Sequence, residues 1–328
     1  MGGAILAGGE GQAGYGREVA ESVQPRSGMV LYSARSRRAG GLSLGINLFP
    51  DGKRCSFDCA YCEVLPGPGG PAFSIAALES ELASWAEGAM AGLSEGADRV
   101  PNHEDGAEPS RIPLDLAFAG DGEPTLSPLL GSAIESVAAA RVRWPAVFGS
   151  AKMVLITNST GFLDESVVGT LHGAVARHGL EIWAKLDAGT EGWYRRIDRR
   201  GPDFERLFAA LLSFSRRSPV VIQSMFCAVS SGSPGEAPVP APASEIEAWA
   251  RRLVELAEGG ALIDGLQVYT QSRASPHRLT SPLDDASLLS IARLASAALE
   301  GGRPSPRYPI PIRVFGRQAE LDVPGGLP

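Results

Sequence analysis

The chain has 328 residues, of which 44% are hydrophobic, and a formal net charge of −7. This length suits one barrel-sized domain or two ordinary ones, and the acidic balance argues against a globally basic surface for nucleic acid. With no run of 18 apolar residues and no secretion-signal pattern at the first residues, neither a membrane span nor export is expected. Only four cysteines occur, three of them clustered, so we expect a reduced, cytoplasmic protein rather than a disulfide framework.

Residues 1–27 are rich in glycine and polar residues, and we expect a flexible N-terminal tail there. The string GEGQAG within it (Gly9, Gly11, Gly14) has the spacing of a dinucleotide-binding fingerprint. However, the apolar run before it has only the letters AIL, and no acidic residue stands about 20 residues further on. The tail is therefore preferred over a cofactor loop.

From residue 42 onward, short runs rich in β-branched residues alternate with segments of helical periodicity. The expected strands are 42–49, 114–120, 152–158, 181–188, 219–227 and 265–271. The expected helices are 74–90, 128–144, 163–179, 203–216, one that begins at the capping box Ser244-x-x-Glu247, and 283–299 entered through Ser281-Pro282. Six such units predict a parallel sheet that curls into a complete or partial barrel.

The domain organisation follows from this alternation. We expect a core over residues 28–300 and a C-terminal extension over 301–328. The core carries two polar, Gly/Pro-rich insertions, 93–112 and 229–243, which we expect to be mobile loops.

Three cysteines follow the first expected strand with the spacing C-x3-C-x2-C: Cys55, Cys59 and Cys62. In parallel α/β folds, chemistry gathers at the carboxyl ends of the strands, which is where this loop falls. A structural zinc ion normally takes four protein ligands, whereas three thiolates on a [4Fe–4S] cluster leave one iron free for a small molecule. We therefore prefer the cluster, with zinc or incidental buried thiols as alternatives. Cys227, far downstream, is interpreted as a small buried apolar residue.

This cysteine spacing, with the aromatic Tyr61 before the last cysteine, resembles the radical S-adenosylmethionine (SAM) superfamily. In that family the free iron chelates SAM, and one electron from the cluster cleaves SAM to a 5′-deoxyadenosyl radical that abstracts hydrogen from the substrate. The resemblance covers about residues 30–275. It implies a partial (βα)6 TIM-like barrel of the radical SAM type, [4Fe–4S] and SAM as cofactors, an oxidoreductase- or lyase-type reaction, and a flavodoxin or ferredoxin as electron donor.

The resemblance also implies a set of cofactor-binding residues near the strand ends: Tyr61, Gly120, Asp121, Gly122, Glu123, Asn158, Ser159, Asp187 and Ser224. The string AGDGEPT resembles the family's glycine-rich GGE segment, whose backbone and carboxylate hold the amino group of SAM. Asp187 is placed like the ribose-binding residue of the family, and Tyr61 is expected near the adenine. For the other positions, ordinary turns, helix entries or core hydrogen bonds are the alternatives.

Lys185 is one of only three lysines in the chain, and strand alternation places it on one face with Trp183 and Asp187. If Asp187 faces SAM, Lys185 faces the lumen and becomes a candidate catalytic residue. It would bind a carboxylate or phosphate, or form an imine if its pKa is lowered. The alternative is a structural partner of Glu123 or Asp187.

The strings CSFDCAYCE, GDGEPTLSP and KLDAGT are similar to Fe–S oxidoreductases grouped with 4-demethylwyosine synthase, which builds a modified base on tRNA. This chain lacks the additional N-terminal cysteines of those enzymes. Two arginine groups, at 35–38 and 195–200, permit RNA contact or simply form solvated faces; DNA and membranes are not expected as partners. A tRNA-modifying enzyme and a non-catalytic cluster-binding scaffold remain alternatives, although the intact Glu123 and Asp187 count against a scaffold.

Overall fold

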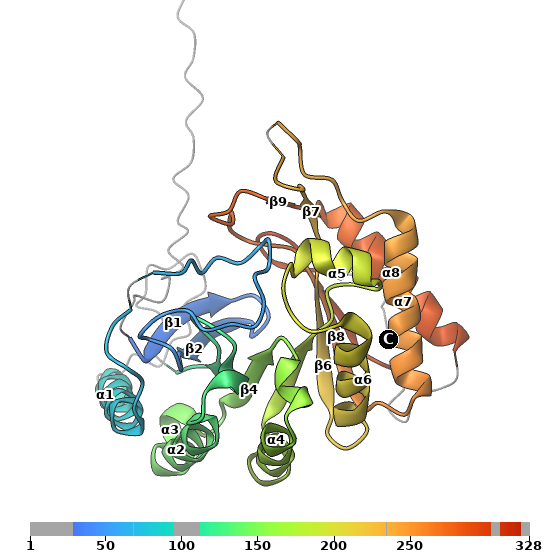
Figure 1. The fold of residues 1–328 in the computed structure, drawn as a ribbon. Coiled ribbons are helices and arrows are strands. Elements are labelled where there is room, and N and C mark those ends of the chain that lie inside the picture. The colour runs from blue at the N-terminus through green and yellow to red at the C-terminus, as the bar shows by residue number, and fades with distance from the viewer. Residues whose placement is uncertain (1–28, 68, 95–111, 234, 303–308, 323–328) are drawn as a thin grey trace, which may run out of the picture.

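A computed structural model describes residues 29–67, 69–94, 112–233, 235–302 and 309–322, and the fold is mixed α/β (Figure 1). The strands are β1 (Leu31–Ser36), β2 (Gly41–Ile46), β3 (Asp115–Phe118), β4 (Lys152–Thr157), β5 (Glu181–Lys185), β6 (Val220–Met225), β7 (Cys227–Val229), β8 (Ile263–Tyr269), β9 (Thr280–Pro282), β10 (Ile312–Phe315) and β11 (Glu320–Leu321). The predicted N-terminal tail and nearly all of the first predicted insertion lie outside the described residues.

The helices are α1 (Ile75–Ser94), α2 (Leu130–Arg143), α3 (Pro145–Phe148), α4 (Glu165–His178), α5 (Glu191–Ile197), α6 (Phe204–Ser215), α7 (Ala243–Glu258) and α8 (Asp285–Gly301), with 3-10 turns η1 (Pro124–Leu126) and η2 (Thr160–Leu163). They line the outside of the curved sheet (Figure 1). Within the described residues, none of these helices is long and apolar enough to cross a membrane.

The main sheet has nine strands in the order β1-β2-β3-β4-β5-β6-β8-β10-β11. The neighbours from β2 to β10 all pair in parallel, while β1 and β11 pair antiparallel at the two edges. The prediction of a partial (βα)6 barrel is confirmed, because the six expected strands are β2, β3, β4, β5, β6 and β8. Sequence patterning missed β1, which precedes the βα alternation, and β10, which continues it, because β10 follows α8 and pairs in parallel with β8.

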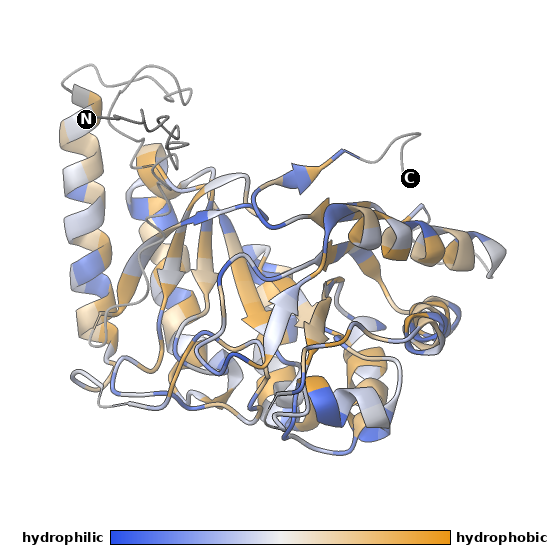
Figure 2. Cartoon of the chain, turned by 90° about the horizontal axis from the view of Figure 1, so that it is seen from above, coloured by the Kyte–Doolittle hydropathy of each residue, from blue (hydrophilic) through white to orange (hydrophobic). Residues whose placement is uncertain are grey.

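Helical packing follows the apolar periodicity of each segment. In α6, the buried side chains Phe204, Leu207, Phe208, Leu211 and Phe214 recur at the three- and four-residue spacing that forms one face of a helix. Figure 2 shows the hydrophobic colouring concentrated on the strands and on the inward faces of the helices. The core therefore lies between the convex face of the sheet and its helical cover.

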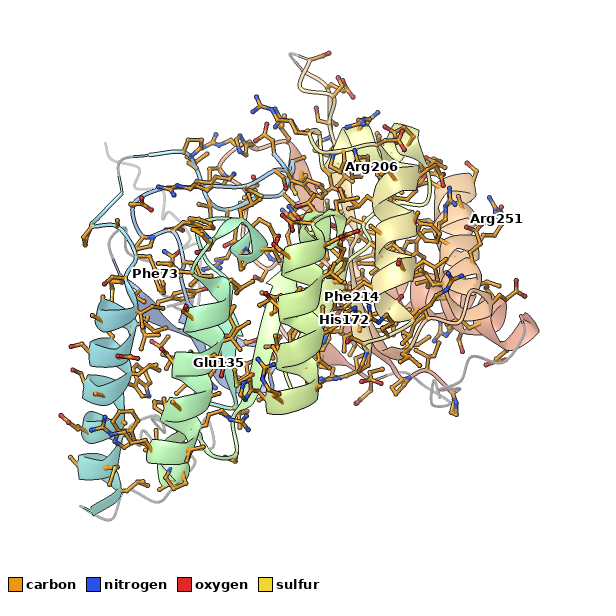
Figure 3. All side chains as sticks on the ribbon, turned by 60° about the horizontal axis from the view of Figure 1, so that its bottom comes forward. Phe73, Glu135, His172, Arg206, Phe214 and Arg251 are labelled. Carbon is orange, nitrogen blue, oxygen red and sulfur yellow. The ribbon has the colours of Figure 1, made fainter. Side chains whose placement is uncertain are left out.

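Two histidines on α4, His172 and His178, contact other side chains of the helical layer. The imidazole of His172, on α4, stacks on the ring of Phe214 with 4.6 Å between centroids, and its Nδ1 lies 2.6 Å from the Ser218 hydroxyl. His178 pairs with Glu135 on the outer surface. Figure 3 shows His172, Phe214 and Glu135 on the helical layer, so His172 does not lie in the lumen.

Two predicted helix entries were wrong. Helix α7 follows Pro242, which makes no side-chain cap, so the capping box Ser244-x-x-Glu247 does not form. Helix α8 is capped by Asp284, whose carboxylate accepts from the amide of Ser287 at 2.7 Å. The segment Ser281-Pro282 instead belongs to β9, which pairs with β7.

The predicted boundary at residue 300 does not separate two bodies of structure, since β10 pairs in parallel with β8. The predicted loop 229–243 also has ordered pairing, because Val229 and Val239 form an antiparallel bridge.

The β1–β2 hairpin links the two sides of the partial barrel. Its turn carries Arg37, whose Nη2 donates to the carbonyl of Thr270 just after β8 at 3.2 Å. Arg313 on β10 donates from Nη1 to the carbonyl of Arg38 at 3.2 Å. The hairpin turn thus reaches the far side of the sheet, and a lumen lies between them.

Candidate cofactor site

The loop with the three cysteines leaves the carboxyl end of β2 and is fastened first to the glycine-rich segment after β3. The amide of Arg54 donates to the carbonyl of Asp121 (3.1 Å), and the amide of Glu123 donates to the carbonyl of Arg54 (2.8 Å). A Cβ at Gly122 would lie 2.0 Å from the Arg54 oxygen. Gly122 is therefore needed for the approach of the cysteine loop rather than of a ligand.

Three further segments hold the same loop. The amides of Asp58 and Ala60 donate to carbonyls at the end of α5, at 3.1 and 2.8 Å. The Ser56 hydroxyl lies 2.8 Å from that of Thr160 after β4, and the Ser275 hydroxyl donates to the carbonyl of Cys62 at 3.1 Å. With four anchors from distant parts of the chain, the loop is held in one shape before any ligand arrives.

The three thiols are half-buried and each contacts a different polar group. Cys55 Sγ accepts from the Phe57 amide at 3.4 Å, and Cys62 Sγ accepts from Lys53 Nζ at 3.4 Å. Cys59 Sγ donates to the carboxylate of Asp198 at 3.1 Å. Burial raises the pKa of the Cys55 and Cys59 thiols. In the chain alone they are neutral, and a positively charged metal centre would favour their thiolates.

A zinc ion and an iron–sulfur cluster place different demands on the spacing of the three thiols. Zinc–sulfur bonds of about 2.3 Å require thiolates within about 4.6 Å of one another. Over the described ranges, no three His, Cys, Asp or Glu side chains gather closely enough to hold one metal ion. An iron–sulfur cube distributes its ligands over separate irons and accepts a wider triangle. Cys227 is not part of this loop: it is buried on β7 in an apolar cluster with Met225 and Val229.

Glu123 does not face the lumen. Its side chain is buried, and its Oε1 accepts from the amide and hydroxyl of Thr125 and from the hydroxyl of Thr157, while Oε2 accepts from the amide of Asn158 at 2.7 Å. Burial raises the pKa of this carboxyl, although these donors oppose the rise. Four donors occupy the acceptor sites of a carboxylate, so Glu123 fixes the turns after β3 and β4.

Asp121, two residues earlier, has the opposite placement. It is half-buried and lines the cavity, with its Oδ2 accepting from Asn47 Nδ2 at 3.0 Å. Its neighbour Gly120 has φ of +150°, and a Cβ there would lie 2.7 Å from Asn47 Oδ1. Within the GDGE segment, Asp121 lines the cavity, whereas the carboxylate of Glu123 is held by protein donors.

The two residues after β4 hold the loop from the side. Asn158 Nδ2 donates to the Ser56 hydroxyl at 2.9 Å and contacts Cys55 Sγ at 3.6 Å. Ser159 is fully buried in a left-handed conformation with φ of 70°, and its hydroxyl donates to the carbonyl of Lys185 at 3.4 Å. Asn158 thus reaches the cysteine loop, whereas Ser159 joins β4 to β5.

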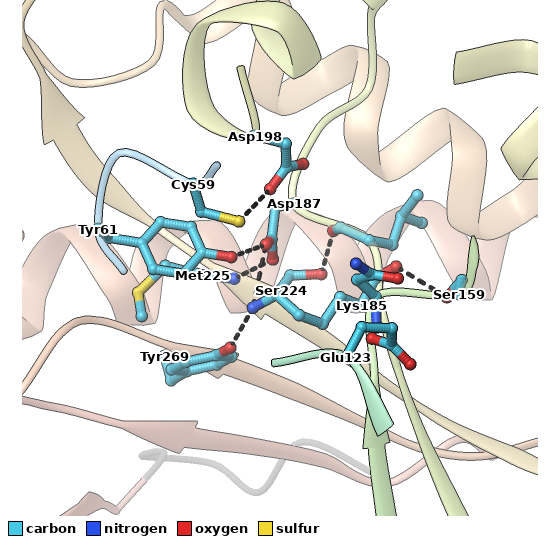
Figure 4. Close-up of polar contacts among 12 residues, drawn as sticks. Cys59, Tyr61, Glu123, Ser159, Lys185, Asp187, Asp198, Ser224, Met225 and Tyr269 are labelled. Carbon is cyan, nitrogen blue, oxygen red and sulfur yellow. Dashed lines mark hydrogen bonds and ion pairs between the residues drawn. The ribbon is translucent and has the colours of Figure 1, made fainter. Parts of the chain in front are cut away.

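Lys185, Asp187 and two tyrosines form one buried network (Figure 4). Lys185 Nζ lies 3.1 Å from Asp187 Oδ2 and donates to the Tyr269 hydroxyl at 2.8 Å. The Tyr61 hydroxyl donates to Asp187 Oδ2 at 2.5 Å, and the amide of Met225 donates to Oδ1 at 2.8 Å. The structure therefore brings together Tyr61, Lys185 and Asp187, as the sequence predicted.

The charge on Lys185 bears on the hypothesis that this lysine forms an imine. Burial lowers the pKa of this ammonium, but Asp187 and Tyr269 raise it further, so the net pKa lies above its ordinary value. A raised pKa favours the ammonium form of Lys185, whereas imine formation needs the neutral amine. Its alternative, a structural partner of Asp187, describes the observed geometry.

Asp198 belongs to this site, although sequence analysis did not propose it. Burial, and then the nearby Asp187, raise the pKa of Asp198 to about 8. Its signal was hidden because it sits in WYRRIDRRG, a charged string typical of an exposed helix. The three neighbouring arginines that form ion pairs explain that string: Arg195 with Glu191, Arg196 with Glu236 and Arg199 with Asp58.

Ser224, a predicted cofactor-binding residue, makes hydrogen bonds within the core. Its hydroxyl donates to the carbonyl of Leu186 at 2.6 Å and accepts from Trp249 Nε1 on α7 at 3.0 Å. It faces the helices because β6 alternates: Gln223, on the opposite face, donates to Gln267 Oε1 at 2.7 Å.

The lumen is a cavity of about 640 Å³. It lies between the β1–β2 hairpin, the ends of the central strands and the segment after β8. Its charged lining includes Asp121, a predicted cofactor-binding residue, and residues that sequence analysis treated as a surface cluster or did not single out: Arg35, Arg37, Arg38, Lys53, Glu63, Asp115 and Arg273. The cysteine loop borders it through Lys53 and Glu63.

No family model matches the sequence. The chain is similar to a UPF0026 protein of Helicobacter pylori (strain J99), with 27% identity over 186 residues, or 55% of this chain. Those residues are 49% of that protein, so the chain spans about half the length of the curated relative it matches.

Several solved structures are similar in fold. TYW1 (4-demethylwyosine synthase) with a lysine–pyruvate adduct bound shares 17% identity over 79% of this chain and 74% of its own, with a TM-score of 0.48. A radical SAM methyltransferase from Sphaerobacter thermophilus shares 14% over 84% and 66%, with a TM-score of 0.49. An archaeal TYW1 shares 15% over 78% and 72%, with a TM-score of 0.41.

Proposed function

We propose that this chain is a radical SAM enzyme whose cysteine loop holds a [4Fe–4S] cluster beside a cavity for SAM and a substrate. One observation carries the proposal. Three half-buried thiols lie on a loop that four distant segments fasten at the carboxyl edge of a parallel sheet. When bound, the cluster supplies the electron that cleaves SAM to a 5′-deoxyadenosyl radical, which takes hydrogen from the substrate.

Cys55, Cys59 and Cys62 would hold the cluster. The chain places hydrogen-bond donors against two of these sulfurs, Lys53 Nζ at Cys62 and Asn158 Nδ2 at Cys55. Donors to ligand sulfurs, together with the positive charge of Lys53, stabilise negative charge there and raise the reduction potential of a cluster. These two residues therefore tune how readily the centre accepts an electron.

SAM would bind along the strand ends. Asp121 presents its carboxylate to the cavity, where it would accept from the ammonium of SAM, and Gly120 keeps that edge free of a side chain. Glu123 would act on SAM indirectly, by fixing the turns that carry Asp121 and Asn158. Tyr61 and Asp187 keep their proposed roles near the adenine and ribose, with Lys185 holding Asp187 in place.

The surrounding biology is proposed on the same basis. A low-potential donor of the flavodoxin or ferredoxin type would reduce the centre in the cytoplasm, and the reaction would be of oxidoreductase or lyase type. The tRNA-modifying alternative gains no support from the second arginine group, because three of its four members form ion pairs with acidic residues. A non-catalytic scaffold would keep the cysteine loop without cleaving SAM.

The test is SAM cleavage by anaerobically reconstituted, dithionite-reduced protein. Wild type should form 5′-deoxyadenosine and methionine in equal amounts, and Cys55→Ala should form neither. Cys227→Ala is the matched control, because this fourth cysteine lies off the loop, and it should cleave SAM as wild type does. Cleavage that survives in Cys55→Ala would refute the proposal, while a wild-type cluster without cleavage would assign the scaffold role.

A further inference from the structure

The wall of the cavity formed by the β1–β2 hairpin is rich in positive charge. Five cationic and three anionic side chains line the cavity, in a chain whose net charge is −7. A positive lining inside an acidic protein concentrates anions locally, because low-dielectric walls focus the field. The cavity therefore favours a ligand with a negative group.

Two arginines on this wall have guanidinium groups without a carboxylate partner in the described part of the chain. Arg37 is fixed by its bond to the carbonyl of Thr270, and its Nη1 is buried with no partner. Arg38 lies against the rings of Tyr269 and Trp183, with Cζ 5.1 and 5.8 Å from their centroids. Guanidinium groups held in this way present planar donors to a carboxylate or phosphate.

Two acceptors on the same cavity are buried and unsatisfied. Asp115 is 3% exposed and Gln271 is 4% exposed, and both line the cavity. Within the described residues, Asp115 Oδ1 and Gln271 Oε1 have no hydrogen-bond partner. Buried polar atoms in folded proteins almost always have partners, so these oxygens call for a donor that the chain does not supply.

We infer that the cavity binds a small-molecule substrate with an anionic group, carboxylate or phosphate, against Arg37 and Arg38 and a donor nitrogen against Asp115 and Gln271. The inference rests on the proposed function only in naming the ligand as the substrate. A volume of about 640 Å³ suits a small molecule held beside SAM, rather than a folded polynucleotide.

The experiment measures binding to reconstituted protein without reductant, so it does not depend on turnover. Calorimetry uses three probes: phosphoethanolamine, which has both groups; inorganic phosphate, the anion alone; and ethanolamine, the amine alone. β-Alanine, acetate and ethylamine form the matching carboxylate set and distinguish the two anion sources. In one set, the two-group probe should bind at least 10-fold more tightly than the anion alone, and the amine alone should not bind.

Two substitutions then test which residues bind the anionic group of the probe and which bind its amine. Arg37→Gln should weaken the binding of both anionic probes at least 10-fold. Asp115→Asn should weaken the binding of the two-group probe only, to the affinity of the anion alone. Arg251→Gln, an exposed arginine on α7 (Figure 3), is the matched control and should change nothing. No binding of either anionic set, or equal binding by wild type and Arg37→Gln, would overturn the inference.

Competition separates this site from its neighbours. Saturating SAM should leave the probe affinity within twofold, and displacement of the probe by SAM would assign the arginines to SAM instead. Binding of tRNA that depends on Arg37, with no binding of any probe, would also overturn the inference. Failure of SAM cleavage alone would contradict the proposed function but leave these binding results standing.

Discussion

The two sides of the cavity differ in how they treat buried polar groups. On the side of β4, β5 and β6, the carboxylate of Glu123 accepts from four neighbouring donors and that of Asp187 from three. On the side of the hairpin, Arg37, Asp115 and Gln271 keep buried atoms without partners in the described residues. A satisfied network fixes its own shape, whereas an unsatisfied one is completed by a ligand. The comparison separates residues that shape the site from residues that bind.

On the satisfied side of the cavity, the largest change in stability is expected when Lys185 is substituted. Lys185→Met leaves Asp187 as a buried carboxylate without its ammonium, and we expect a loss of about 3–5 kcal/mol in the free energy of unfolding. Denaturant unfolding with and without the double variant Lys185→Met/Asp187→Asn measures this, and the double variant should recover part of the loss.

The control for this prediction is Lys152→Met, which removes an exposed ion pair with Glu181. It should cost about 1 kcal/mol or less, because solvent screens the pair. Equal losses for the two lysines would contradict the structural role of Lys185. A borohydride-stabilised carbonyl adduct on Lys185, seen by mass spectrometry, would show that Lys185 forms an imine.

Glu123→Gln tests the same satisfied side with a smaller change. An amide cannot accept from four donors, so at least one buried hydroxyl or amide loses its partner, at a cost of about 1–3 kcal/mol. The exposed Glu135→Gln, which loses contacts to Arg177 and His178, should change stability by about 1 kcal/mol or less. Thermal unfolding of both variants gives the comparison, and a neutral Glu123→Gln would place that carboxylate outside the structural network.

Substitution of Asp115, on the unsatisfied side, should raise the free energy of unfolding, whereas the substitutions above lower it. Burial raises the pKa of Asp115, while a hydrogen bond from Ser43 and the charge of Arg38 oppose the rise and Glu181 adds to it. The folded chain thus holds this proton more tightly than the unfolded chain. The contribution of Asp115 to the free energy of unfolding is therefore greatest at pH values below 3.8, the ordinary pKa of this side chain. It is lost as the pH rises through the folded-state pKa.

Asp115→Asn removes this pH-dependent penalty. Without ligand, we expect the variant to be more stable than wild type by about 1 kcal/mol at pH 8, with the difference shrinking toward pH 4. Denaturant midpoints across that range give the measurement. A variant less stable than wild type at pH 8 would mean that Asp115 Oδ1 also has a partner in the folded chain.

The sequence predicted the satisfied side better than the open one. Strand alternation correctly grouped Lys185 with Asp187, and the position after β2 correctly placed the cysteine loop at the carboxyl edge. Both results follow from local rules of periodicity and chain order. For Glu123 and Ser224, a family motif and a strand position do not say which way a side chain points, and the structure surrounds both with protein hydrogen-bond partners.

The open side depends on contacts between distant segments. Arg37 and Arg38 lie in an isolated hairpin with the composition of a surface cluster, and only the closing of the barrel brings them to β5 and β8. Asp115 stands at the start of a strand, the end where chemistry is not expected. Asp198 is concealed among arginines. No pattern within a short window could have revealed these burials.

The central claim is that three thiolates leave one corner of an iron–sulfur cube open to SAM. Its most direct test is the electron paramagnetic resonance spectrum of reduced, anaerobically reconstituted protein, recorded with and without SAM. We predict a [4Fe–4S] signal that changes shape when SAM is added in wild type and Cys227→Ala and is absent in Cys59→Ala. A protein that instead holds one zinc ion, or a cluster whose signal is unchanged by SAM, would contradict the account.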